Sequence, residues 1–135
     1  MLSFPASIRV FVARDPVDFR KAHDGLVAIV RDEFGDDPFD GSVFVFLNRR
    51  ADRVKVIHWD RDGLWLHYKR LEHGRFELGL DGAGARAEIS RPQLAMLLDG
   101  IDLERRKIRS PFDAQLRIKR RGRHGDQRAE ARSPE

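Results

Sequence analysis

The feature that most constrains the fold is a run of alternating apolar and polar residues, broken by short turn sequences. This alternation predicts four strands, at residues 43–48, 53–59, 64–71 and 75–79. The sequences "RRAD", "DRDG" and "HG" connect them and are short enough to form hairpins. The segment therefore predicts a four-stranded antiparallel meander.

The connector lengths also predict how the strands pair. If Trp59 pairs with Leu64 across "DRDG", Arg53 falls opposite Arg70. Pairing Asn48 with Arg53 across "RRAD" sets the register of the first hairpin in the same way.

Side chains on a strand alternate between its two faces, so this register sorts the sheet into two surfaces. One surface is mostly apolar and is expected to seat the first helix: Val43, Val45, Leu47, Val54, Val56, Trp65, Leu71, Phe76 and Leu78, with His58, His67 and Lys69 among them. The opposite surface mixes aromatic and basic side chains: Phe44, Phe46, Arg53, Lys55, Ile57, Leu66, Tyr68, Arg70, Arg75 and Glu77.

The mixed aromatic and basic surface has three possible roles. Arg53 opposite Arg70 is a destabilising pair unless an anion lies nearby, and the anion could be Glu77 or a phosphate. If the surface is open, aromatic and basic side chains together favour nucleic-acid binding. Alternatively, the second helix covers it with Lys and Arg at the margin, or a protein partner contacts it.

Helices are predicted on both sides of the meander. A strand at 8–13 precedes a helix at 16–34, which would begin with Asp15 as N-cap and Pro16 at its first position. Gly25 within that helix indicates close packing against a neighbour. A second helix is predicted to begin after Ser90, its N-cap.

The remaining segments are predicted to be irregular. Residues 80–87 read as a flexible, Gly-rich connection, and the hydrophobic pattern fails after about residue 110. We therefore expect one α+β domain over 1–109: an N-terminal strand and helix packed on the meander, plus a short C-terminal helix. Residues 110–135 would be a disordered basic tail.

Charge and composition limit the classes of function. The 135-residue chain has no cysteine, which excludes disulfides, thiol catalysis and Cys-based zinc sites. It has no apolar run long enough to span a membrane and no signal-peptide pattern, so a cytoplasmic location is expected. Residues 41–76 have eight Lys and Arg against four Asp and Glu, and residues 101–135 have eleven against six. These two basic zones favour an anionic partner, first of all nucleic acid.

A cluster of His and Asp residues suggests a metal-dependent nuclease as a rival interpretation. The candidate ligands are His58, Asp60, Asp62, His67 and His73. His58 and His67 fall on the apolar surface, and Asp60 and Asp62 lie in a turn where Asp is common for conformational reasons. No metal site is therefore predicted.

Three stretches carry a family resemblance: "VDFRKAHDGLVAIV", "DPFDGSVFVFLNRRADRVKVIHWDRDGLWLHYKRLEHGRF" and "ISRPQLAMLLDGIDL". Over about residues 4–103 the chain resembles the TnpB-type accessory protein of bacterial insertion-sequence-66 transposons, the product of the second open reading frame. The resemblance implies a role in transposition beside the element's transposase, and it brings no catalytic residues. Ala22 and His23 depart from the family pattern, as does the long basic tail.

These observations predict a non-catalytic accessory protein for transposition, without cofactor, metal or small-molecule substrate. Its expected partners are DNA and the transposase of the same element, and no membrane. A metal-dependent nuclease and a pure protein–protein adaptor are the alternatives. The predicted contact residues for nucleic acid or a protein partner are Phe46, Arg49, Arg50, Arg53, Lys55, Tyr68, Arg70 and Arg75.

Overall fold

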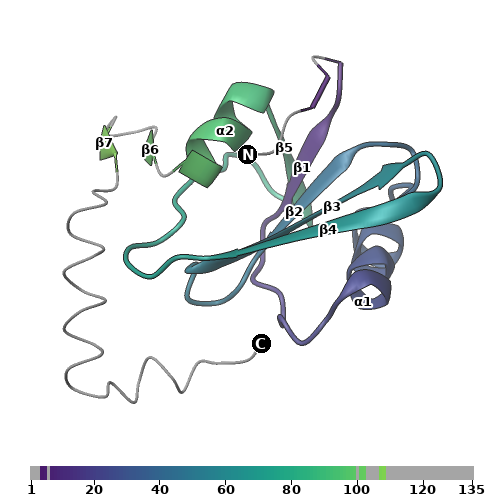
Figure 1. The fold of residues 1–135 in the computed structure, drawn as a ribbon, viewed down its shortest axis with the longest axis horizontal. Helices are drawn as coiled ribbons and strands as arrows, with labels where there is room; N and C mark the ends of the chain where they lie inside the picture. Colours follow the sequence, from purple (N-terminus) through teal and green to yellow (C-terminus); the bar gives the residue numbers. More distant parts are fainter. Residues whose placement is uncertain (1–3, 6, 100, 103–106, 109–135) are drawn as a thin grey trace.

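A five-stranded mixed sheet with the strand order β4-β3-β2-β1-β5 forms the centre of the fold (Figure 1). The computed structural model describes residues 4–5, 7–99, 101–102 and 107–108. The sheet strands are β1 (Val10–Ala13), β2 (Val43–Leu47), β3 (Arg53–Asp60), β4 (Gly63–Arg70) and β5 (Arg86–Ile89). The helices are α1 (His23–Ala28), which continues into the π-helix η1 (Ile29–Phe34), and α2 (Arg91–Asp99). Two short strands, β6 (Ile101–Asp102) and β7 (Lys107–Ile108), pair separately.

The connections follow from the lengths of the segments between strands. β1 and β2 run parallel and are joined by the crossover containing α1 and η1, because parallel neighbours require a long connection. β2, β3 and β4 form an antiparallel meander through tight turns, and β5 pairs antiparallel with β1 at the far edge. The predicted α+β class is therefore confirmed.

The predicted register of the first three strands of the meander is also confirmed. Lys55 lies opposite Phe46 on β2 and opposite Tyr68 on β4. Arg53 lies opposite Arg70, as the length of the "DRDG" turn requires.

The predicted strand at 75–79 is wrong, and the fifth strand lies elsewhere. The Phe76 N–H donates to the Ala51 carbonyl (2.7 Å) at the end of the sheet. Phe76 and Leu78 pack in the core cluster that contains Leu94 and Leu97 of α2. The strand next to β1 is instead Arg86–Ile89, within and just after the predicted flexible connection. Ala87 and Ile89 are buried there, while Arg86 and Glu88 alternate with them.

The first helix begins later than predicted, at His23 instead of residue 16. The preceding segment is fixed in a non-helical path because the Val17 N–H donates to the Leu47 carbonyl (2.9 Å). The Phe19 carbonyl accepts a hydrogen bond from the Lys55 amine (2.8 Å). Gly25 does pack closely, since a Cβ there would lie 2.8 Å from the Cβ of Lys21.

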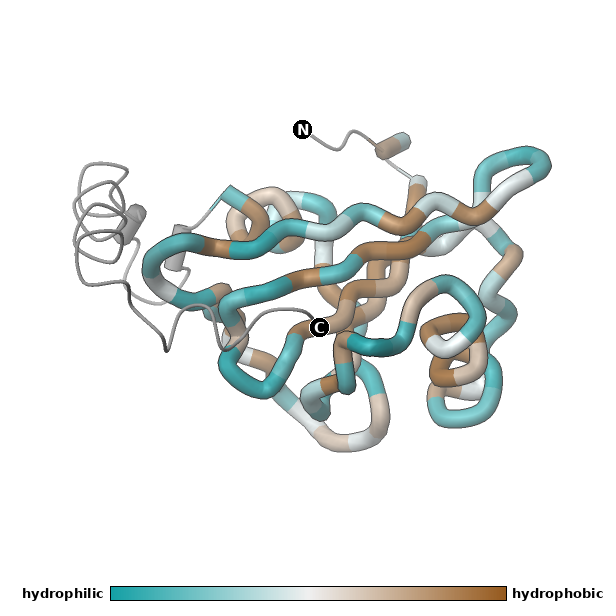
Figure 2. Tube along the Cα trace, turned by 60° about the horizontal axis from the view of Figure 1, so that its bottom comes forward, coloured by the Kyte–Doolittle hydropathy of each residue, from teal (hydrophilic) through white to brown (hydrophobic). Residues whose placement is uncertain are grey.

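The two helices cover opposite faces of the sheet (Figure 1). Each helix covers the face that the sequence assigned to the other. α2 covers the valine face, where Leu94 and Leu97 pack with Val10, Val45 and Val56. The aromatic face is covered by α1 and η1, whose buried side chains pack with these sheet residues: Phe11, Phe44, Phe46 and Ile57. Figure 2 shows hydrophobic residues concentrated in the strands between these layers, while the hairpin loops are hydrophilic.

Helix α2 begins as the sequence predicts. The Ser90 hydroxyl accepts a hydrogen bond from the Gln93 N–H (3.1 Å), and the Gln93 side chain accepts one from the Ser90 N–H (2.7 Å). This reciprocal capping box satisfies two backbone donors at the helix start. No helix within the described ranges is long and apolar enough to cross a membrane.

Candidate nucleic-acid interface

The loop between β2 and β3 is held in one conformation by the side chain of Asn48. Its amide oxygen accepts a hydrogen bond from the Arg53 N–H (3.0 Å), and its amide nitrogen donates to the Asp52 carboxylate (2.8 Å). The Ala51 N–H closes a turn on the Asn48 carbonyl (2.9 Å), and Ala51 has a positive φ of 59°. Arg49 and Arg50 at the tip are exposed, and these hydrogen bonds define the path of the backbone that carries them.

Two further backbone hydrogen bonds bring other arginines to the same end of the sheet. The Leu71 N–H donates to the Asp52 carbonyl (2.8 Å), so Arg70 at the end of β4 lies next to this loop. The bond from Phe76 to Ala51 places Arg75 there as well. We call the four exposed side chains the basic end: Arg49, Arg50, Arg70 and Arg75.

The charges of the basic end are only partly compensated within the described residues. Arg70 forms an ion pair with Glu72 (2.8 Å), and its side chain remains about half exposed. Arg49 and Arg50 form no ion pair within the part of the chain that the structure describes. An anion can therefore approach these two guanidinium groups without displacing a carboxylate.

Tyr68 connects the basic end to the core. The residue is 46% exposed, and its hydroxyl accepts a hydrogen bond from Arg53 Nη1 (3.1 Å). The ring also packs edge-on against Phe19, with centroids 5.9 Å apart. Tyr68 thus offers a fixed aromatic surface two residues before Arg70.

Three of the predicted contact residues lie in the interior. Phe46, Arg53 and Lys55 are at most 5% exposed, because α1, η1 and the segment before α1 cover their face of the sheet. The expectation of an open aromatic and basic face is therefore wrong for these three side chains. The covering element is the first helix, where the sequence interpretation considered the second.

Lys55 has a structural environment that its sequence context does not reveal. Its Nζ donates to the carbonyls of Phe19 (2.8 Å) and Lys21 (2.6 Å). The same amine lies 4.9 Å from the ring centroid of Phe19 and 5.3 Å from that of Tyr68. Lys55 therefore fixes the path of the chain before α1.

The rival cluster of possible metal ligands is dispersed. His58 and His67 lie together, with their Nε2 atoms 3.3 Å apart, while Asp60 and Asp62 belong to the turn between β3 and β4. Within the described residues, no group of three or more His, Asp or Glu side chains is close enough to hold a metal ion. The structure thus brings two of the five candidate ligands into direct contact.

The histidine pair is shielded from water enough to alter its protonation. Partial burial lowers the pKa of both His58 and His67, and the His67 charge lowers the pKa of His58 further. Both rings are therefore neutral at pH 7, and one can donate a hydrogen bond to the other. Trp65 stacks on both rings, and it is 54% exposed although the sequence placed it on the core face.

Comparisons with known proteins agree with the resemblance seen in the sequence. The model of the family described as IS66 Orf2-like protein (TnpB_IS66) matches residues 8–108. Uncharacterized protein y4jC of Sinorhizobium fredii is 36% identical over 114 residues, which cover 82% of this chain and 97% of that protein. Uncharacterized protein y4hO of the same organism is 39% identical over 102 residues, covering 76% and 88%.

No solved structure matches the chain. Since the family model covers well over half of the sequence, including β1, the whole meander and α2, the chain belongs to the IS66 Orf2-like family of transposon proteins.

Proposed function

We propose that the protein is a non-catalytic accessory factor in transposition that binds DNA of its insertion sequence through the basic end. The observation that supports this proposal is the convergence of Arg49, Arg50, Arg70 and Arg75, which come from two loops and a strand terminus fixed by backbone hydrogen bonds. Guanidinium groups bind phosphate oxygens with two parallel hydrogen bonds, and such bonds set the position of a protein on nucleic acid.

The ordered backbone distinguishes the basic end from a solvated charged surface. A flexible arginine loses conformational entropy when it is immobilised on a phosphate, and a fixed loop reduces that loss. Tyr68 adds an aromatic surface on which an unpaired base can stack. The proposal therefore includes distorted or single-stranded DNA at the element's ends as well as the duplex.

Fluorescence anisotropy with labelled DNA from the element's ends tests the proposal. The double variant Arg49→Ala/Arg50→Ala should bind more weakly, and the slope of log affinity against log salt should become shallower by about 0.9 for each duplex phosphate that the variant no longer neutralises. The matched control is Arg20→Ala/Arg31→Ala, which removes the same charge from arginines paired with Asp18 and Asp32. Equally weakened binding in the two double variants would contradict a localised site.

The basic tail needs a separate measurement, because residues 110–135 lie outside the described residues. Deleting them should lower affinity for all DNA sequences alike and leave any preference for the element's ends unchanged. A preference that disappears with the tail would move the proposed site from the basic end to the tail.

Contact with the transposase remains a prediction, tested by adding transposase to the same anisotropy assay. A further rise in anisotropy that Arg49→Ala/Arg50→Ala does not weaken would assign that contact to another surface.

A further inference from the structure

The two edges of the sheet differ in how they are protected against pairing with another strand. β5 is four residues long, and its two charged side chains form ion pairs: Arg86 with Asp36 and Glu88 with Arg9. Short length and charge are the usual means by which a sheet edge avoids association. The β5 edge is therefore protected.

The β4 edge has charged side chains only at its C-terminal end, where Lys69 and Arg70 lie. β4 is eight residues long, contains no proline, and pairs with β3 without a bulge from Gly63 to Arg70. Its first six residues, "GLWLHY", include no Lys, Arg, Asp or Glu, and the one histidine there has a lowered pKa. No described strand pairs with its outer side. Such a long, regular edge is a template for another strand.

Exposed aromatic side chains accompany this edge. Of the three large hydrophobic side chains exposed in the described residues, Trp65 and Tyr68 both belong to β4. The Trp65 indole makes one long hydrogen bond, 3.4 Å, to Asp60 and is otherwise stacked on the histidine pair. Exposed aromatic residues are enriched at protein–protein interfaces.

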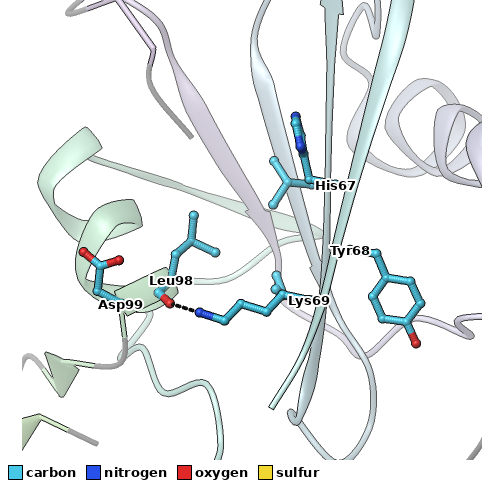
Figure 3. A pocket seen from close by; sticks show the side chains of 7 residues that line it. His67, Tyr68, Lys69, Leu98 and Asp99 are labelled. Atoms are coloured by element: carbon cyan, nitrogen blue, oxygen red, sulfur yellow. Dashed lines mark hydrogen bonds between the residues drawn. The ribbon is translucent and has the colours of Figure 1, made fainter. Parts of the chain in front are cut away.

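A hollow of about 340 Å³ lies beside the same strand, between β4 and the C-terminal end of α2 (Figure 3). Val54 and Val56 contribute its apolar surface, and Lys69 crosses it to donate a hydrogen bond to the Leu98 carbonyl (2.9 Å). Figure 3 shows His67 and Lys69 pointing to this side of the sheet, while Tyr68 points to the other. A large side chain from an added strand could enter this hollow on the His67 side.

We propose that β4 is the interface strand of a homodimer, in which it pairs antiparallel with β4 of a second copy. With Leu66 opposite Leu66 of the second copy, Trp65 falls opposite His67 and Leu64 opposite Tyr68. Because residues at even spacing share a face, this register puts Trp65 of the second copy on the side of the sheet that bears the hollow.

Charge complementarity supports a second copy of this chain as the occupant. The same register sets Asp62, in the turn before β4, opposite Arg70 of the second copy, twice by symmetry, where Arg70 also pairs with Glu72 of its own chain. It opposes no two like charges along β4. A shift of one residue would turn the second copy over, so that unlike faces of the two sheets would lie on the same side and the two-fold symmetry would be lost. The edge is thus complementary to itself, as an isologous interface must be.

Cysteine crosslinking tests this register directly, because the natural chain has no cysteine. Leu66→Cys should form an intermolecular disulfide on mild oxidation, since directly opposed strand positions have Cα atoms within disulfide range. Leu64→Cys should crosslink much less, because in this register the residues at position 64 of the two copies are far apart. Efficient crosslinking through His67→Cys in place of Leu66→Cys would overturn the Leu66-centred pairing.

Light scattering during size exclusion tests whether the dimer exists. The full chain should elute with a mass near twice 15.6 kDa, and Trp65→Lys should elute as a folded monomer by circular dichroism. Phe39→Lys, which changes an exposed aromatic residue outside β4, should remain dimeric.

Charge exchange separates the interface from general effects on the fold. Asp62→Arg should weaken the dimer, and adding Arg70→Asp to the same chain should restore it. A monomeric wild-type chain, or a dimer unaffected by Trp65→Lys, would overturn the proposal. Neither result bears on DNA binding, which is tested through Arg49 and Arg50; Arg70 belongs to both surfaces, so its variants are used only to test the dimer.

Discussion

Replacing Lys55 by methionine tests whether its buried amine determines the path of the chain before α1. The variant keeps most of the side-chain volume but removes the hydrogen bonds to Phe19 and Lys21 and the cation–π interactions with two rings. Bonds from a charged donor contribute about 1.5–3 kcal/mol each, and a desolvated cation over a ring contributes about 0.5–2 kcal/mol. Methionine, in contrast, does not incur the cost of burying an ammonium group, which is on the order of several kcal/mol.

The expected balance is a decrease of about 2–3 kcal/mol in the free energy of unfolding, because two carbonyls are left without their donor. Urea unfolding followed by tryptophan fluorescence measures this decrease as a lower midpoint with an unchanged m-value. The matched control is Lys69→Met, since that exposed amine makes one bond, to Leu98, and should cost at most about 1 kcal/mol. If Lys55→Met were as stable as the wild type or as Lys69→Met, the assigned role of Lys55 would be refuted.

Two further predictions concern the groups around the β3–β4 hairpin. Because His58 and His67 have lowered pKa values in the folded state, the unfolded chain binds more protons, so stability should be complete above about pH 6.5 and decrease as the pH falls through the lowered pKa values. Urea midpoints at pH 5 and 7.5 measure this, and His67→Gln should reduce the difference between them. We also expect the purified protein to leave DNA and RNA intact with Mg²⁺ or Mn²⁺. Metal-dependent cleavage that Asp60→Ala/Asp62→Ala abolishes would instead support the nuclease interpretation.

The meander was predictable because its signals are local. Alternation at 43–71 and two short connectors specify three strands and their register, and the structure has that register from Val43 to Arg70. The capping box at Ser90 is likewise contained within four residues. Each of these features depends on neighbours along the chain or across one hairpin.

The predictions that were wrong concern structure that depends on residues distant in the sequence. Residues 75–79 alternate like a strand, but the Phe76 N–H is bonded to Ala51, and Phe76 and Leu78 pack in the core cluster that contains Leu94 and Leu97. Residues 16–22 have the sequence of a helix start. However, Lys55, more than thirty residues later, donates hydrogen bonds to the carbonyls of Phe19 and Lys21. Alternation identified the two faces of the sheet without specifying which helix would cover each.

The motif "RRADRVK", which contributes to the family resemblance, divides into two physical roles once the faces are assigned. Asp52 accepts a hydrogen bond from Asn48 within the loop. Arg53 donates one to the Tyr68 hydroxyl, and Lys55 donates one to the Phe19 carbonyl before α1. Arg49 and Arg50 lie on the exposed tip that these hydrogen bonds support. The sequence alone does not separate the five charges, since all are polar residues in one basic stretch. Removing the three supporting side chains should therefore lower stability, and it should weaken DNA binding through unfolding or through loss of the loop conformation. Removing the two tip arginines should lower DNA binding at unchanged stability, so within this motif the tip variants are the ones that test the proposed function.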